Sequence, residues 1–483
     1  MTTVGELDAL VGVVASYEPS SAQLECARLR LADACFGYQL GRGTSMAGLL
    51  DRLGGHLSAS PSRTTPGTTA FELAACIRYT ETDDILLASC VTPGAIVAPA
   101  AMAIAGAGPS MPSDRLLGAT VVGYGVAAWC GVLCGGVGAL EQGRWPSREI
   151  ASLTAAMTSG RALGLDRAQL MDAALLASIW HVEGRLTEPA RELSFARAVA
   201  LGVEAAEAAS LGVKGERGVA KAVPTNGPGL AGSSRAAGIV DALDRAIGDA
   251  RVKLFCSAQQ AVSGLLALKK VLEASGTRRL EEIDAIELEL PRACAELVDR
   301  PVVHTRLESL SSIQYQAAAV VLDPSVLWDV RREELTLTGA AARVAPLLRV
   351  RASEERPSAS PAQWGARATL VAAGQSWSEE VDDHPRPGGI DAQLLGAKHR
   401  AFLGADTAGL SFATVALEAC MELETGGDLW AILQLIDALS ASGSSPEVEP
   451  GASATAETED NVVHFALMDA GEATSEYRGS GSA

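Results

Sequence analysis

Apolar positions along the first half of the chain recur with the spacing of α-helices. Between residues 22 and 53 they fall three or four positions apart, at Leu24, Ala27, Leu31, Ala34 and Cys35, which is typical of amphipathic helices. Further helical pattern runs from Phe71 to about Leu211. Residues 57–69 and 222–236 are rich in Gly, Pro, Ser and Thr, so both are expected to be loops.

The pattern changes after about residue 275. Residues Ile283–Leu290 alternate apolar and polar side chains and end at a proline, which is a strand signature. Leu347–Val350 and Ala366–Ala372 are two further short strand candidates, and helical pattern returns between Asp391 and Leu439. The sequence therefore predicts a mainly α fold with an α+β insertion.

These changes of pattern set the expected domain limits. We expect a helical domain made of residues 1–255 and 395–440, with an α+β lid domain at 256–394 between them. The remaining residues, 441–483, have the composition of a disordered tail. From residue 444 onward the tail holds eight acidic residues and one arginine, so it carries over a third of the net charge of −19.

The negative net charge of the chain argues against nucleic acid or an anionic membrane as its main partner. With a sequence pI near 4.8, the chain lacks the basic face that nucleic acid or an anionic membrane requires. The stretch Leu116–Leu140 is long enough to consider as a membrane span, but Gly and Tyr interrupt it, and a buried helical hairpin is expected. The start of the chain has no basic or apolar signal segment, so a cytoplasmic location is expected.

Metal chemistry is not expected either. The nine cysteines are scattered without CxxC pairs, which favours reduced thiols. The six histidines are dispersed, and neither residue type shows ligand spacing. The sequence also lacks GxSxG, P-loop, HExxH and strand-linked GxGxxG signatures. Any catalytic site must therefore be assembled from distant segments.

Several blocks, in order, resemble the MmgE/PrpD family, which includes 2-methylcitrate dehydratase and cis-aconitate decarboxylase. Glu81-Thr-Asp83-Asp84 followed by Thr92-Pro-Gly-Ala-Ile-Val-Ala-Pro-Ala resembles the family's "DxDD" turn and "HPSxxVxPA" helix. Further blocks resemble "GYEVAxR", "GxHxT", "AxxLGLD", "KxxHxG" and "FSxxYxxA"; they begin at Gly123, Gly143, Gly160, Arg191 and Ser312. The resemblance covers about residues 5–440.

The resemblance implies a helical domain built from both ends of the chain, an α+β lid, and a homodimer. It also implies an active site in the cleft. Typical members eliminate water, decarboxylate or epimerise small polycarboxylates with no metal or organic cofactor. A base removes a proton next to a carboxylate, while cationic groups hold the developing charge.

At several family positions this chain carries another residue. The first Asp of "DxDD" falls on Glu81, and the residue that follows the whole motif falls on Ile85. The later family lysine corresponds to Lys253. Family histidines fall on Thr92, Trp145, Ser194 and Gln260, and a family lysine falls on Arg191. Loss of the histidines removes the usual proton shuttle near neutral pH, which favours a changed reaction in the same cleft.

The expected roles follow from these positions. Glu81 is expected to be the acid or base, and Arg191 and Lys253 to hold an anion. The expected substrate-binding residues are Tyr79, Asp83, Asp84, Ile85, Thr92, Trp145, Ser194, Gln260 and Tyr315. Each also has a structural alternative: a tryptophan or tyrosine can belong to the core, and the aspartates can cap the next helix.

Three functions stay open. The favoured one is a lyase or isomerase without a cofactor that cyclises, dehydrates or isomerises a larger secondary metabolite, such as a polyketide-like molecule. The second is a lyase acting on a small polycarboxylate. The third is a paralogue that binds a ligand without catalysis.

Overall fold

The structure is a computed structural model in which the chain forms two compact units. Of the described residues, the first contains those between 4 and 251 and between 411 and 441, and the second contains those between 252 and 410. The domain limits predicted above are not tested by this division and stay a prediction. The structure describes residues 4–57, 65–179, 190–217, 235–277, 279–332, 335, 337–353, 364–382, 390–404 and 406–441.

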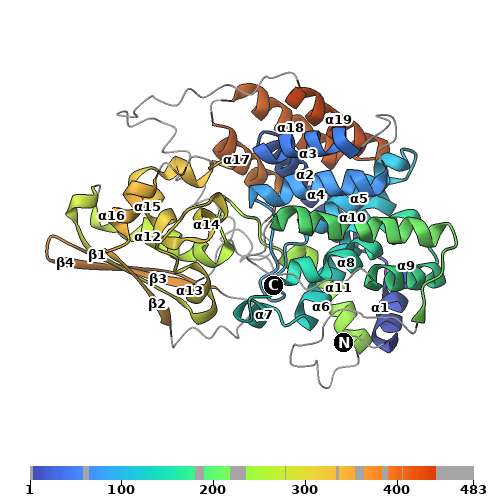
Figure 1. The fold of residues 1–483 in the computed structure, drawn as a ribbon, viewed down its shortest axis with the longest axis horizontal. Helices are drawn as coiled ribbons and strands as arrows, with labels where there is room; N and C mark the ends of the chain where they lie inside the picture. The colour runs from blue at the N-terminus through green and yellow to red at the C-terminus, as the bar shows by residue number, and fades with distance from the viewer. Residues whose placement is uncertain are drawn as a thin grey trace, which may run out of the picture. The chain divides into compact units, whose positions relative to one another are not determined.

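The first unit is built from helices (Figure 1). In chain order they are α1 (Val4–Ser16), α2 (Ser21–Arg42), α3 (Ser45–Leu57), α4 (Pro66–Thr80), α5 (Gly94–Ala107), α6 (Ser113–Leu133), α7 (Val137–Glu141), α8 (Pro146–Leu163), α9 (Arg167–Ile179), α10 (Arg191–Ser210), α11 (Arg235–Asp249), most of α18 (Thr407–Met421), and α19 (Gly426–Ala441).

Local signals explain where the early helices start. Ser20 accepts from the backbone of Gln23, whose side chain accepts from the Ser20 amide, so α2 begins with a capping box. Thr65 caps α4, and Pro66 occupies the first helical position, which suits its fixed φ and missing N–H. The loop predicted over residues 57–69 was therefore too long, because α4 already begins at Pro66.

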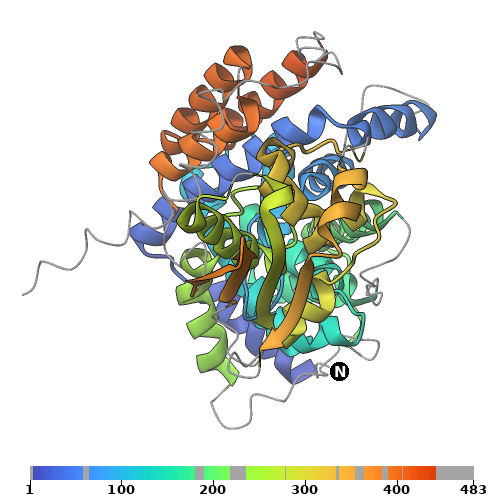
Figure 2. The ribbon, with the colours of Figure 1, turned by 90° about the vertical axis from the view of Figure 1, so that its left-hand side faces the viewer.

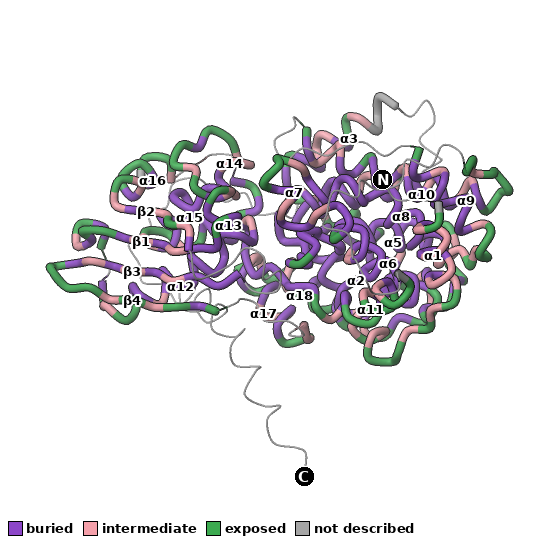
Figure 3. The backbone as a smooth tube through the Cα atoms, turned by 90° about the horizontal axis from the view of Figure 1, so that it is seen from below, coloured by how far each residue is buried: buried purple, intermediate pink, exposed green. Residues whose placement is uncertain are grey.

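Helices α5, α6 and α8 form the centre of the first unit, and Figure 3 shows them almost entirely buried. Gly123 of α6 permits their close approach, because a Cβ there would lie 2.4 Å from Thr158 Oγ1 and 2.7 Å from Val97 Cγ1. Helix α6 is long and apolar enough to cross a membrane, yet 89% of its most apolar window is buried inside the unit. It therefore has the burial of a core helix.

The last helices of the chain pack against the first. Arg28 on α2 donates to the carbonyl oxygen of Leu423 at 2.9 Å, and Tyr38 donates to Asp437 Oδ1 at 2.7 Å. Helix α19 also packs on α5, where a Cβ on Gly106 would lie 2.5 Å from the Trp430 ring. The first unit is therefore completed by residues more than 350 positions apart in the sequence.

The second unit combines helices with one mixed sheet (Figure 2). The strand order is β2-β1-β3-β4, with β1 parallel to β2 and antiparallel to β3, and β3 antiparallel to β4. Helix α12 packs on β3 and β4, and α13 on β1 and β2. The elements are α12 (Gln259–Ser275), η2 (Leu280–Glu282), β1 (Ile283–Pro291), α13 (Arg292–Val298), α14 (Arg306–Ser311), α15 (Ile313–Leu322), η3 (Pro324–Leu327), α16 (Thr338–Val344), β2 (Leu348–Ser353), β3 (Ala366–Ala372), β4 (Gln375–Val381) and α17 (Ala392–Leu403).

The predicted fold class, mainly α with an α+β part, is confirmed. All three predicted strands exist, although β2 begins one residue later than expected and extends to Ser353. Strand β4 was not predicted, because only Val381 is buried in it and it lacks the apolar face that marks a strand. The predicted disordered tail lies outside the described residues from 442 onward.

Candidate functional site

The acidic turn after α4 places three carboxylates inside the first unit. Glu81 ends α4 in the left-handed conformation, with φ of 56°, which is uncommon for a residue with a Cβ. Glu81, Asp83 and Asp84 are each at most 5% exposed. Buried carboxylates require partners: Glu81 and Asp83 share Arg78, whereas Asp84 pairs with Arg30.

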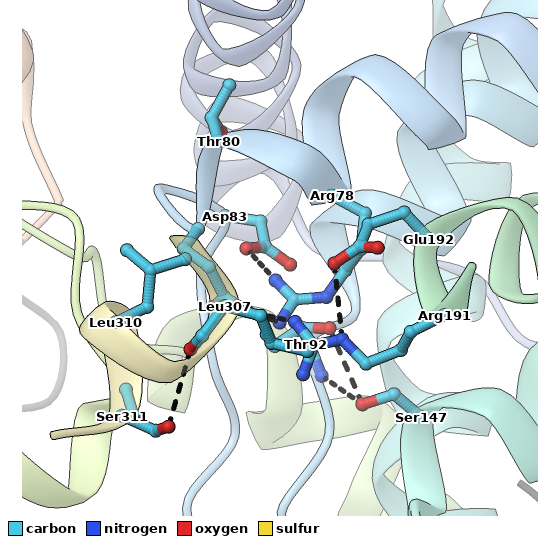
Figure 4. Close-up of polar contacts among 12 residues, drawn as sticks. Arg78, Thr80, Asp83, Thr92, Ser147, Arg191, Glu192, Leu307, Leu310 and Ser311 are labelled. Atoms are coloured by element: carbon cyan, nitrogen blue, oxygen red, sulfur yellow. Dashed lines mark hydrogen bonds and ion pairs between the residues drawn. The ribbon is translucent and has the colours of Figure 1, made fainter. Parts of the chain in front are cut away.

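Glu81 pairs with two arginines, Arg78 and Arg191, and Figure 4 shows both arginines beside Asp83 and Glu192. Arg78 and Arg191 both donate to Glu81 Oε1, the latter at 2.6 Å. Arg78 also donates to Asp83 Oδ1 at 2.5 Å, and Arg191 pairs with Glu192 at 3.2 Å. Burial lowers the pKa of Arg78, but Asp83 and Glu81 more than offset this and raise it overall. The result is a buried cluster of alternating charges that holds both guanidinium groups in place.

Trp145, the residue that caps α8, contacts both arginines. The Arg191 guanidinium lies 4.9 Å and that of Arg78 5.9 Å from the centre of its ring, within the range of cation–π attraction. Phe195 on α10 stacks on the same ring system at 5.4 Å with an interplanar angle of 25°. Trp145 is only 4% exposed, so these contacts lie inside the first unit.

Hydroxyl groups border this cluster at the start of α8. The Thr92 amide donates to Ser147 Oγ at 3.1 Å, and the Thr92 hydroxyl lies 3.4 Å from the same oxygen. Arg148 Nε donates to Ser194 Oγ at 2.9 Å. Thr92 and Ser194, two of the predicted substrate-binding residues, are thus hydrogen-bonded to the first turn of α8.

Asp84 faces a second network. It accepts from the amide of Gly94 at 2.8 Å and from Tyr124 Oη at 2.7 Å, and Arg30 Nη1 lies 3.3 Å from it. Burial raises its pKa, while Arg30 and Tyr124 oppose the rise. Because Gly94 is the first residue of α5, Asp84 stabilises that helix start, the structural alternative considered from sequence.

Asp83 and Asp84 line a small cavity with Arg30, Asp33 and Tyr124. The volume of the cavity is about 10 Å³, which is close to the minimum for one water molecule. This cavity is therefore too small to hold an organic substrate.

The other predicted site residues make different contacts. Tyr79 approaches Ser45, with 3.2 Å between the two hydroxyl oxygens, and Ile85 pairs through its backbone with Arg251. Lys253, Gln260 and Tyr315 are buried in the second unit. The prediction that Glu81, Asp84, Thr92, Trp145, Arg191 and Lys253 line one cavity stays a prediction.

Sequence reasoning missed Arg78, Ser147 and Arg148. Arg78 had a usable signal, since it interrupts the apolar end of α4 three residues before Glu81, a spacing that places two side chains on one helix face. Ser147 is the last residue of the "GxHxT" block and Arg148 follows it, but neither was assigned a role. Among the described residues, no three His, Cys, Asp or Glu side chains are grouped as metal ligands.

Comparison with known families agrees with this picture. Residues 43–224, which include Arg78, Glu81, Trp145 and Arg191, match the MmgE/PrpD N-terminal domain. No curated protein matches the chain. Family members are generally lyases of the dehydratase type. The ordered motifs and this match together support membership of the MmgE/PrpD family.

Proposed function

We propose that the protein is a dehydratase-like lyase whose substrate carries a carboxylate that binds Arg191. The observation that carries this proposal is the convergence of Arg191 and Arg78 on one carboxylate oxygen of Glu81, beside the ring of Trp145. A pair of buried, fixed guanidinium groups is a ready site for a second carboxylate. Membership of the MmgE/PrpD family suggests dehydratase-like chemistry.

The chemistry follows from charge. A base removes the proton from the carbon next to the substrate carboxylate, and negative charge develops on the carboxylate oxygens. Arginine stays cationic at any working pH and stabilises that charge through two hydrogen bonds in a fixed fork. The carbon–oxygen bond at the next carbon then breaks, and the hydroxyl leaves as water after accepting a proton.

Glu81 can serve this reaction in two ways. In the first, Glu81 is the acid or base, as predicted from sequence. Proton transfer to Glu81 would then weaken its ion pairs with Arg78 and Arg191. Its contacts also support an anchoring role, in which Glu81 orients both arginines and the substrate carboxylate binds beside it. Lys253 as a second anion holder stays part of the proposal.

The surroundings support a larger, less polar substrate than a small polycarboxylate. Trp145 and Phe195 form an aromatic pair beside Arg191, and Trp145 and Thr92 stand at family histidine positions. We therefore favour a polyketide-like acid, for which cyclisation or isomerisation through the same enolate is equally open. Homodimeric assembly, a cytoplasmic location and independence from cofactors stay predictions from the resemblance and the sequence.

The test is a turnover screen with the purified protein. One panel holds cis-aconitate and 2-methylcitrate, and the other holds β-hydroxy and β-keto acids with long apolar chains. Loss of water, or a rearranged product of equal mass, is followed by mass spectrometry. Turnover restricted to the first panel would favour the small-polycarboxylate lyase, and none in either panel would favour a non-catalytic paralogue.

A pair of variants on α10 tests the role of Arg191. Arg191→Ala should weaken both substrate binding and turnover, because it removes the proposed carboxylate holder. Arg197→Ala is the matched control, since its side chain is 57% exposed and pairs with Glu204. Equal activity of the two variants on the true substrate would contradict the proposal.

A further inference from the structure

A pocket in the second unit is lined by residues that the candidate site described above does not include. It is bounded by the end of α12, the start of β1, the end of α15 and the start of η3. The volume of the pocket is about 170 Å³. A cavity of roughly 150 Å³ is enough to admit benzene, so this pocket suits a ligand of about that size.

Part of the pocket lining is charged. Lys269 lines it, although the side chain is only 3% exposed, and its ammonium group lies 3.2 Å from Glu273 Oε1. Lysine is rarely buried this far unless it is paired. Arg279, also in the lining, pairs with Glu282 at 2.8 Å and is 73% exposed. With two cations and one carboxylate, the lining carries a formal charge of +1.

Much of the remaining lining is apolar. Leu272, Ile283, Val320 and Pro324 contribute to it, and the first three are each at most 9% exposed. A ligand that fits this lining has a negative group for Lys269 and a compact hydrocarbon body. Small carboxylates with an apolar ring or branched chain have this chemistry.

Glu273 shows how such a ligand would bind. Its side chain is 47% exposed, whereas that of Lys269 is buried. Glu273 can therefore turn toward solvent at little cost while a ligand carboxylate takes its place on the lysine. Exchange of one carboxylate for another keeps the buried ammonium group paired, so binding leaves no buried charge without a partner.

We propose that this pocket is a binding site for a small apolar monocarboxylate, held by Lys269 and separate from the Arg191 site. The probe is benzoate, with benzamide as an uncharged molecule of the same shape. Isothermal titration of the full chain should show saturable benzoate binding and at least about tenfold weaker benzamide binding, the scale for losing a hydrogen bond to a charged group.

Variants assign the binding to the pocket. Lys269→Met should weaken benzoate at least about tenfold, while Lys270→Met, the neighbouring lysine on α12, should not change it. Glu273→Gln should strengthen binding because it removes the competing carboxylate. Val321→Trp, which fills the pocket from a partly exposed position and keeps Lys269, should abolish it, and circular dichroism checks that each variant is folded.

The Arg191 site is the other place where benzoate can bind, and Arg191→Ala separates the two. Binding unchanged in Arg191→Ala but lost in Lys269→Met or Val321→Trp supports the proposal. Benzoate binding that Val321→Trp leaves intact overturns it, as does loss of binding in Arg191→Ala alone or no saturable binding at all.

Discussion

The guanidinium group of Arg191 lies 4.9 Å from the centre of the Trp145 ring while it donates to Glu81 at 2.6 Å. In the resemblance to the family, these two positions correspond to a lysine and a histidine. The pair in this chain places a guanidinium group against an aromatic face, an arrangement that suits holding an anion.

Trp145→Leu should lower the free energy of unfolding by about 2–5 kcal/mol, because it removes a large buried ring and the attraction to both arginines. Trp145→Phe should cost less, since it keeps an aromatic face against Phe195. Urea unfolding followed by circular dichroism gives both values. Equal losses for the two variants would show that the aromatic contacts contribute little.

Glu81→Gln should cut turnover at least about a hundredfold if Glu81 transfers a proton, and the limb of the pH–rate profile that reports its ionisation should disappear. If Glu81 instead anchors the arginines, the variant should mainly raise KM and lower the melting temperature, with the profile unchanged. Glu81→Asp restores the family's residue and should retain a measurable share of turnover. Wild-type kcat and KM in Glu81→Gln would contradict both roles.

His399 should make the protein sensitive to acid. It is 3% exposed, and burial together with Lys398 and Arg400 lowers its pKa from 6.5 to about 3. The folded protein therefore holds His399 neutral while the unfolded chain binds a proton below pH 6.5. The associated stability is present above about pH 6.5 and is lost as pH falls toward 3.

The size of this effect is on the order of a few kcal/mol at the acid end, since each pKa unit corresponds to about 1.4 kcal/mol. His399→Phe keeps a ring but cannot titrate. Melting temperatures of both proteins between pH 4 and 7.5 should show a steeper acid decline for the wild type. Parallel curves would indicate that His399 titrates normally.

Gly123→Ala should destabilise the first unit by about 1–3 kcal/mol, because the added Cβ would overlap Thr158 and Val97. Gly248→Ala is the control. It also lies in a helix, α11, but a Cβ there meets nothing within 4 Å, so it should be neutral or stabilising by up to about 1 kcal/mol. Thermal melts of the two variants test the difference, and a shared sign would refute the packing argument.

The comparison of sequence and structure separates local from long-range information. Strand β3 was predicted with its observed limits. Every second residue in it is buried, and this alternation depends only on residues that are neighbours in the sequence. Strand β4 was not predicted, since it lies at the sheet edge and buries a single side chain. Edge strands are stabilised by backbone pairing with a neighbour, which leaves no apolar pattern to find.

The site shows the same division. Glu81 and Arg191 were expected to act together on the strength of the family resemblance, and they are in direct contact. Asp84 was grouped with them, but its neighbours are Arg30 and Tyr124, contacts that depend on how α2 and α6 pack. Helical spacing does not specify which of two adjacent aspartates faces which arginine, so this part required the structure.

The packing of α19 on α2 and α5 has a consequence for protein synthesis. During translation, α2 and α5 leave the ribosome more than 300 residues before α19 does, which is at least about 15 s at ordinary rates of elongation. All residues of the second unit that the structure describes are made in that interval. The N-terminal helices must therefore wait, with the apolar surface for α19 uncovered, and a chaperone that shields it on the nascent chain would raise the yield of folded protein.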